Sequence, residues 1–386
     1  MTRPLRAVST ENPAAVLTSL RQALAGGDAI LPGTPRTPTP ARVEQRVAVV
    51  IETSGSTGAP KLVALSADAL LASAVAAESY LGGTGQWLLA LPTNYIAGIN
   101  VLVRSITSRF DPVYLGRGHF DVDRFAAAAQ TMAAPLRFSS LVPAQLSRLV
   151  YAAEHDGDLL RIIRRLDGIL VGGQSTPQEI VVRARSLGLK LTRTYGSSET
   201  CGGCVYEGSP IGATRARVID GQVQLAGPML AEGYVGNPAA TAAAFRTEDG
   251  SRWYRTGDTG EITDGVLRVT GRLDGVIISG GEKVSLDAIE KIVRGMTGLA
   301  DAVVVRSPSA SWGEVPVVFV TEEATLAEVK TNVVAELGRA SAPAALVRIK
   351  SIPQTPNGKP DRTALAAFAA AHGDSGHPGR YDFNRG

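Results

Sequence analysis

The feature that most constrains the fold is the alternation of short apolar runs with helix-like segments through the first half of the chain. An amphipathic helix is expected over 12–25, before the first run. Strands that alternate with helices predict an α/β domain whose ligands bind beyond the carboxyl ends of the strands. The five strand-like runs are VAVVI (47–51), WLLAL (87–91), LRFSSLV (136–142), LDGILV (166–171) and LKLTRTY (189–195).

The pattern changes after about residue 215, where short runs separated by turn residues favour antiparallel strands. Farther along, two helical and three strand-like segments predict a separate α+β unit. We therefore expect an α/β fold with a large domain of mixed sheets and a small α+β domain, joined by a hinge. The expected parts are the large domain (1–271), the hinge (272–275), the small mobile domain (276–370) and a disordered tail (371–386).

Composition and charge exclude several classes of protein. The 39 Lys and Arg nearly balance 36 Asp and Glu, and they are scattered, so no nucleic-acid partner is expected. No apolar stretch approaches the ~18 residues that cross a bilayer, and the first 30 residues lack a signal peptide's apolar region. We expect a cytoplasmic protein that acts on small molecules, with no stable membrane association.

The segment CGGC has the spacing of a metal or redox half-site. There is no second cysteine pair, and the histidines at 119, 155, 372 and 377 show no ligand spacing with Cys201 and Cys204. We therefore expect the glycines between the cysteines to matter more, as flat backbone walls of an acyl pocket.

The segment TSGSTGAPK follows the first predicted strand and suits a polyphosphate. Gly55 and Gly58 let the backbone approach an anion, and Lys61 adds a positive charge. It is not a Walker A loop, because Ala59 and Pro60 separate the last glycine from the lysine. A Ser- and Gly-rich surface loop is the alternative. The expected ATP contacts here are Thr53, Ser54, Gly55, Ser56, Thr57, Gly58 and Lys61.

Five further segments follow this loop in the order shown by the adenylate-forming superfamily, which the chain resembles from about residue 45 to 370. They are VGGQST (171–176), TYGSSET (194–200), YRTGD (254–258), GRLDGVIISGGEKVS (271–285) and TPNGKPDR (355–362). The resemblance implies ATP, Mg²⁺ and coenzyme A as reactants or cofactors, and an acyl-adenylate intermediate.

The resemblance also implies roles for individual residues. Glu199 and Thr57 would hold Mg²⁺, and Lys359 would stabilise charge on the α-phosphoryl group. Asp258 would accept hydrogen bonds from the ribose hydroxyls, and Arg272 would donate to ribose or phosphate oxygens. Rotation of the small domain about Asp274 would separate the two half-reactions. Taken alone, each is an ordinary solvated or turn residue. Further ATP contacts implied are Gly172, Gly173, Gln174, Thr194, Tyr195, Gly196 and Ser198.

Arg104 interrupts the apolar segment 88–106, and a buried guanidinium needs an anionic partner, such as a second carboxylate on the substrate. A surface salt bridge is the alternative. Together with the segments 136–146 and 194–208, this segment resembles the short o-succinylbenzoate–CoA ligases of menaquinone synthesis, although Tyr95 stands where that family usually has His. The implied substrate contacts are Tyr95, Arg104, Ser140, Gly173, Ser197, Gly202 and Gly203.

The resemblance implies conversion of 2-succinylbenzoate, ATP and coenzyme A to 2-succinylbenzoyl-CoA, AMP and pyrophosphate. Three alternatives stay open: an aryl- or acyl-CoA ligase for a monocarboxylate, an adenylation enzyme that loads a carrier protein, and a non-catalytic nucleotide-binding protein. The oligomeric state is also open, with a homodimer as one candidate.

Overall fold

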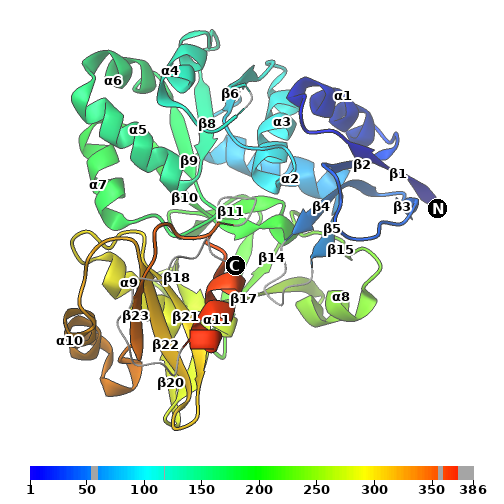
Figure 1. Cartoon of the computed structure of the whole chain (residues 1–386). Coiled ribbons are helices and arrows are strands. Elements are labelled where there is room, and N and C mark those ends of the chain that lie inside the picture. Colours follow the sequence, from blue (N-terminus) through cyan, green and yellow to red (C-terminus); the bar gives the residue numbers. More distant parts are fainter. Residues whose placement is uncertain (54–59, 117, 355–359, 373–386) are drawn as a thin grey trace. The chain divides into compact units, whose positions relative to one another are not determined.

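A computed structural model describes residues 1–53, 60–116, 118–354 and 360–372 of the chain. The chain divides into two compact units (Figure 1), which are described separately below. The larger unit holds 1–219, 224–256 and 262–268, and the smaller unit holds 220–223, 257–261 and the chain from 269 onward.

The first sheet of the larger unit has the strand order β15-β5-β4-β2-β1-β3. Its centre is the predicted run at 47–51, which is buried and therefore apolar at every position. β4 pairs antiparallel with β5, with Thr53 opposite Lys61, and parallel with β2. The bounds are β1 Thr2–Val8, β2 Ala29–Pro32, β3 Arg42–Glu44, β4 Val47–Thr53, β5 Lys61–Ser66 and β15 Gly233–Tyr234.

Strand β1 was not expected from the sequence, because its residues TRPLRAV show no apolar run. Its anchor is a buried charge. The guanidinium of Arg3, 4% exposed, donates to the carbonyl oxygens of Val47 at 2.5 Å and of Ala23 and Gly27 at 2.8 Å. One side chain thus ties β1 to β4 and to the end of α1 (Pro13–Leu24), the predicted amphipathic helix.

The second sheet, of order β12-β11-β10-β9-β8-β6-β7, contains the four later predicted runs. Strands β6 to β10 are parallel, and β11 returns antiparallel to β10. The bounds are β6 Gln86–Leu89, β7 Val113–Tyr114, β8 Arg137–Leu141, β9 Gly168–Val171, β10 Leu191–Ser197, β11 Gly202–Tyr206 and β12 Ser209–Pro210. The α/β prediction for this half is confirmed.

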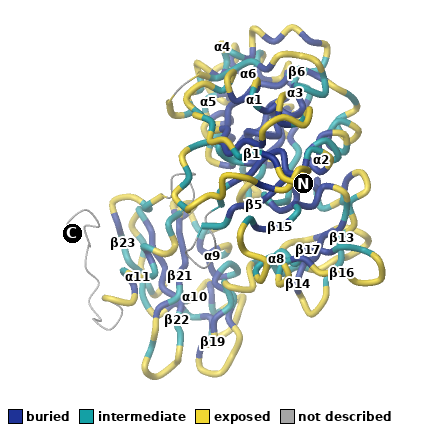
Figure 2. The backbone as a smooth tube through the Cα atoms, turned by 90° about the vertical axis from the view of Figure 1, so that its right-hand side faces the viewer, coloured by how far each residue is buried: buried dark blue, intermediate teal, exposed yellow. Residues whose placement is uncertain are grey.

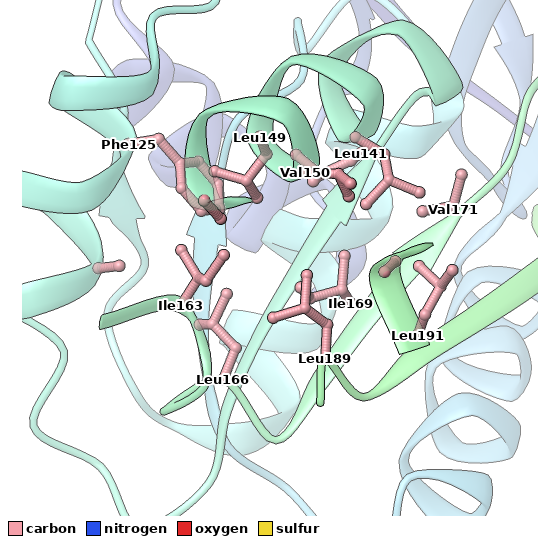
Figure 3. Close-up of a cluster of buried hydrophobic side chains, with 14 of the residues drawn as sticks. Phe125, Leu141, Leu149, Val150, Ile163, Leu166, Ile169, Val171, Leu189 and Leu191 are labelled. Atoms are coloured by element: carbon pink, nitrogen blue, oxygen red, sulfur yellow. The ribbon is translucent and has the colours of Figure 1, made fainter. Parts of the chain in front are cut away.

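One face of this sheet is covered by helices α4 to α7, as Figure 1 shows. Their side chains form a single apolar cluster with the strands, and Figure 3 shows Leu149, Val150 and Ile163 from the helices facing Leu141 and Ile169 from the sheet. Helix α2 contacts strands of both sheets. The helix bounds are α2 Ala67–Tyr80, α3 Ile96–Ser108, α4 Val122–Gln130, α5 Pro143–His155, α6 Gly157–Ile163, α7 Gln178–Ser186 and α8 Pro238–Ala244.

The sheet β13-β14-β17-β16, with β18 paired to β17, contains the short strands predicted after residue 215, and the division between the units passes through its residues. β16 and β17 pair antiparallel, as expected. The bounds are β13 Arg215–Ile219, β14 Gln222–Ala226, β16 Phe245–Glu248, β17 Ser251–Thr263 and β18 Val266–Arg272.

The smaller unit is built on the sheet β20-β19-β22-β21, with β23 beside β22. Alternate residues of strand β21 serve two cores: Val304 packs with α9 and α10, and Val305 packs with α11. Figure 2 shows β21 and β22 largely buried. Helix α11 was not predicted from the sequence. The bounds are β19 Val276–Ser279, β20 Glu282–Ser285, α9 Leu286–Arg294, β21 Val303–Ser309, β22 Gly313–Val320, α10 Leu326–Leu337, β23 Ala345–Arg348 and α11 Arg362–His372.

The segment GGEKV contains a hairpin turn. β19 and β20 pair antiparallel through Gly280 and Gly281, whose φ values of 58° and 88° are the positive pair that a tight hairpin turn requires. No helix among the described residues is long and apolar enough to cross a membrane. Of the predicted tail at 371–386, residues 371 and 372 end helix α11, and residues 373–386 lie outside the described residues.

Replacing Arg3 with alanine should lower the free energy of unfolding by about 3 kcal/mol, because three carbonyls inside the protein lose a charged donor. Urea unfolding followed by tryptophan fluorescence measures this. A Trp312→Phe background confines the signal to Trp87 and Trp253 of the larger unit.

The matched control is Arg6→Ala on the same strand. Arg6 pairs with Asp28 at 3.0 Å, but the side chains are 68% and 46% exposed. This pair should contribute less than about 1 kcal/mol. Equal losses from the two variants would contradict the structural role assigned to Arg3.

Candidate active site

The predicted site residues of the larger unit gather where strands end. β8, β9 and β10 are parallel neighbours, so their carboxyl ends share one sheet edge. The residues lie as follows: Thr53 ends β4, Lys61 begins β5, Gly172, Gly173 and Gln174 follow β9, Ser140 is on β8, Thr194, Tyr195, Gly196 and Ser197 are on β10, Ser198 and Glu199 are in the turn η1 (Ser198–Thr200), and Gly202 and Gly203 are on β11. The predicted phosphate contacts Ser54, Gly55, Ser56, Thr57 and Gly58 lie outside the described residues.

The glycines after β9 and on β10 and β11 are explained by close packing. A Cβ on Gly172 would lie 2.4 Å from Oγ1 of Thr194, and one on Gly196 would lie 2.0 Å from the carbonyl oxygen of Gly202. Gly202 has a φ of +88°, and a Cβ there would meet Nδ2 of Asn100 at 2.1 Å. Packing alone therefore requires glycine here, and contact of these glycines with an acid stays a prediction.

The two cysteines beside these glycines are buried. Burial raises the pKa of Cys204 to about 12 and that of Cys201 further. Neither thiol is ionised at neutral pH, which removes the form that binds metals and attacks disulfides. The carbonyl of Cys201 instead accepts hydrogen bonds from Ser73 and Asn100 at 2.9 and 2.7 Å, which tie the turn to α2 and α3.

Glu199 is 9% exposed and has a partner that sequence reasoning missed. The Tyr234 hydroxyl donates to its Oε1 at 2.9 Å, and the Tyr234 ring lies 5.0 Å from Nζ of Lys61. Tyr234 therefore joins the predicted metal ligand to the predicted end of the phosphate loop. No local pattern marks this tyrosine, because it lies on a two-residue strand whose position depends on pairing with β5.

The Tyr234–Glu199 hydrogen bond uses one carboxylate oxygen. A carboxylate offers about four lone-pair sites, so the group can still accept a hard cation such as Mg²⁺. The donor chemistry at Glu199 thus fits the predicted metal. Thr57, the other predicted ligand, lies outside the described residues.

Arg104 lies in the protein interior and not on the surface, so the surface salt bridge considered as an alternative is wrong. Its side chain is 3% exposed, its guanidinium carbon stands 4.8 Å from the Trp87 ring, and its Nη2 is 3.4 Å from the hydroxyl of Tyr206. Among the residues that the structure describes, Nε of Arg104 has no hydrogen-bond partner.

Tyr95 and Arg104 lie toward opposite ends of α3. Tyr95 is the N-cap residue, and nine residues of helix place the two backbone positions about 13.5 Å apart. Asn94 hydrogen-bonds the Tyr95 side chain, and burial raises the pKa of its hydroxyl. Ser197 lies on β10 with its Oγ buried and, within the described part of the chain, unpaired. The structure therefore spreads the predicted acid contacts over a span and does not bring them to one point.

In the smaller unit, the predicted ribose-binding pair and hinge residue form one charged cluster. Arg272 contacts Asp258 through Nη1 at 3.0 Å and Asp274 through Nε at 2.7 Å. The backbone N–H of Arg272 donates to Asp287, whose pKa is raised by burial. The two residues predicted to bind the nucleotide, Asp258 and Arg272, thus lie in direct contact.

Lys359 lies outside the described residues, but the chain on both sides of it is tied to the small domain. Gln354 and Pro360 form an antiparallel bridge, and the N–H of Asp361 donates to the carbonyl of Pro353 at 2.8 Å. Arg362 then contacts Glu290 at 2.8 Å, which fixes the start of α11 on α9.

The family of the chain is shown by two family models that match it. The family model for AMP-binding enzymes matches residues 6–263, and the model for the C-terminal domain of these enzymes matches residues 288–359. The chain belongs to the AMP-binding enzyme family. This confirms the predicted superfamily and the predicted fold class of a large α/β domain followed by a small α+β domain.

Individual relatives carry names that specify the acid. A probable 2-succinylbenzoate–CoA ligase of Mycobacterium tuberculosis is 36% identical over 343 residues, covering 86% of this chain and 87% of the relative. A 2-succinylbenzoate–CoA ligase of Listeria monocytogenes is 30% identical over 338 residues, covering 83% and 70%.

Solved structures show the same fold. An arginine-to-lysine variant of E. coli MenE with bound OSB-AMS has a TM-score of 0.76 at 23% identity and covers 96% of this chain and 88% of its own. The o-succinylbenzoate CoA synthetase MenE of Bacillus subtilis, in complex with the acyl-adenylate OSB-AMP, has a TM-score of 0.74 at 21% identity, covering 97% and 84%.

Replacing Gly196 with alanine should reduce both stability and activity of this AMP-binding enzyme. The new methyl group would collide with the Gly202 carbonyl, and overpacking of this kind costs about 1–3 kcal/mol. Differential scanning calorimetry measures the loss. Gly157→Ala is the control, because a Cβ at that exposed position has no neighbour within 4 Å. Equal melting temperatures for the two variants would show that Gly196 does not lie this close to the Gly202 carbonyl.

Proposed function

We propose that this AMP-binding enzyme is an AMP-forming acid–thiol ligase that makes 2-succinylbenzoyl-CoA, AMP and pyrophosphate from 2-succinylbenzoate, ATP and coenzyme A in menaquinone biosynthesis. The observation that carries the choice of acid is Arg104, a buried guanidinium whose Nε lacks a partner among the described residues. Relatives named for this activity, matched over most of both chains, support it.

Arg104 favours a dicarboxylate because its surroundings do not complete its bonding. The guanidinium stacks on Trp87, lies 3.4 Å from the Tyr206 hydroxyl and interacts electrostatically with the Glu78 carboxylate, but its Nε has no partner among the described residues. A carboxylate that accepts hydrogen bonds from the guanidinium supplies the missing partner. 2-Succinylbenzoate carries two carboxylates, so one can be activated while the other is held. A monocarboxylate leaves Nε of Arg104 without that partner.

In the first half-reaction, an oxygen of the acid attacks the α-phosphorus of ATP, and the bond to pyrophosphate breaks. The loop 53–61 holds the β- and γ-phosphates, and Lys359 stabilises the charge that develops on the α-phosphoryl group. Glu199, with Thr57, holds Mg²⁺, which supplies charge neutralisation to the phosphates when bound. Asp258 accepts hydrogen bonds from the ribose hydroxyls, beside Arg272.

The remaining ATP contacts are inferred from the strand-end segments described above. The adenine lies against the backbone of Gly172, Gly173 and Gln174, and Thr194, Tyr195, Gly196 and Ser198 line the nucleotide. Tyr95, Ser140, Ser197, Gly202 and Gly203 contact the acid along with Arg104.

In the second half-reaction, the thiolate of coenzyme A attacks the acyl carbon, and the bond to AMP breaks. We infer that rotation about Asp274 withdraws Lys359 and presents the β19–β20 hairpin for this step. ATP and coenzyme A are both cytoplasmic metabolites, so we place the enzyme in the cytoplasm.

A pyrophosphate-release screen with 2-succinylbenzoate, benzoate and octanoate separates this function from the two ligase alternatives. Faster turnover of benzoate or octanoate than of 2-succinylbenzoate would identify a ligase for monocarboxylates. Pyrophosphate release without thioester formation on free coenzyme A would favour the loading of a carrier protein.

Replacing Arg104 with lysine should raise the KM for 2-succinylbenzoate at least tenfold and leave the KM for ATP within about twofold, because the planar two-donor fork is lost while the charge remains. Steady-state pyrophosphate release measures both constants. The activity with benzoate, which has no second carboxylate, is the internal control and should not fall. If only the KM for ATP changes, Arg104 does not bind the second carboxylate of the acid.

Replacing Lys359 with alanine should lower acyl-adenylate formation by about 10²–10³-fold, the size of effect seen when a transition-state donor is removed. Conversion of preformed 2-succinylbenzoyl-AMP to the thioester should remain close to normal. Rapid-quench measurement of each half-reaction tests this. The exposed Lys350 of the same unit provides the control, since Lys350→Ala should alter neither rate. Parallel loss of both rates in Lys359→Ala would exclude the role.

A further inference from the structure

Tyr234 contacts both Glu199 and Lys61, and the proposed mechanism does not use it. The hydroxyl oxygen lies 2.9 Å from Oε1 of Glu199, and the two residues are 7% and 9% exposed. The ring lies 5.0 Å from the Lys61 ammonium, within the range of a cation–π interaction. A buried hydrogen bond and a cation contact thus converge on a single aromatic side chain.

The backbone holds this side chain in place. Tyr234 pairs with Val63, two residues after Lys61, and its N–H donates to Oγ1 of Thr241 at 2.9 Å. The chain just before β15 is tied to Glu199 itself, because the N–H of Ala231 donates to the Glu199 carbonyl at 2.8 Å. The tyrosine and the glutamate are therefore positioned by the same short stretch of backbone.

We propose that Tyr234 is a positioning residue for the metal: it holds Oε1 of Glu199 so that the second carboxylate oxygen is presented to Mg²⁺. Its ring also steadies Lys61, so the carboxylate that takes the cation and the lysine that follows the phosphate loop keep a constant separation. This inference rests on the proposed ligase function, since Glu199 is the metal ligand only in that mechanism.

Tyr234→Phe removes the hydroxyl and keeps the ring. The Mg²⁺ concentration for half-maximal pyrophosphate release should rise about tenfold, the effect of losing one hydrogen bond to a charged group. Excess Mg²⁺ should restore the maximal rate, and the KM for the acid should not change. Tyr151→Phe, at an exposed tyrosine of α5, is the control and should leave the Mg²⁺ dependence as in the natural protein.

A structural role alone would lower the maximal rate at every Mg²⁺ concentration, and that result would overturn the proposal. Glu199→Gln gives a second measurement. In that background Tyr234→Phe should have no further effect on Mg²⁺ dependence, because the two residues act through the same interaction. Additive effects would also contradict the proposal.

The test can be separated from the ligase function. Calorimetric titration of ATP at several Mg²⁺ concentrations needs no acid and no turnover. If none of the acids tested supports pyrophosphate release by the natural protein, the proposed function fails. This titration still decides the role of Tyr234. A Mg²⁺ dependence of ATP binding that is unchanged in Tyr234→Phe would exclude it.

Discussion

The site depends on one buried carboxylate, that of Glu199. Removing a charge from water is costly, so the group needs a donor where it lies. That donor is Tyr234, which the pairing of β15 with β5 brings to the turn after β10. Because β5 begins at Lys61, the same pairing sets the position of the lysine that follows the phosphate loop. Two segments far apart in sequence thus become parts of one proposed nucleotide site.

Close backbone packing makes this arrangement rigid. Gly196 and Gly202 allow β10 and β11 to approach more closely than any side chain permits, and Asn100 of α3 fills the space beside them. Helix α3 consequently lies against β11, and Arg104 extends that contact to Tyr206. The rigidity that positions Glu199 therefore also buries the arginine that we assign to the acid.

Much of the fold and part of the site could be predicted from the sequence. The apolar runs at 47–51 and 166–171 became buried strands because continuous apolar sequence is stable only when both faces are covered. Strand β1 could not be foreseen, because its stability comes from Arg3 donating to carbonyls more than 20 residues away, and the sequence shows no apolar run there.

What the sequence by itself determined was the order of elements and the chemical groups: hydroxyls and glycines after the first strand, Glu199 after another, and an arginine within an apolar segment. These depend on local periodicity and residue type. Only the tertiary structure decided that Arg104 is buried over Trp87 and that Tyr234 donates to Glu199. Such pairings join residues through strand register and helix packing, and no local pattern contains the long-range distances on which a hydrogen bond depends.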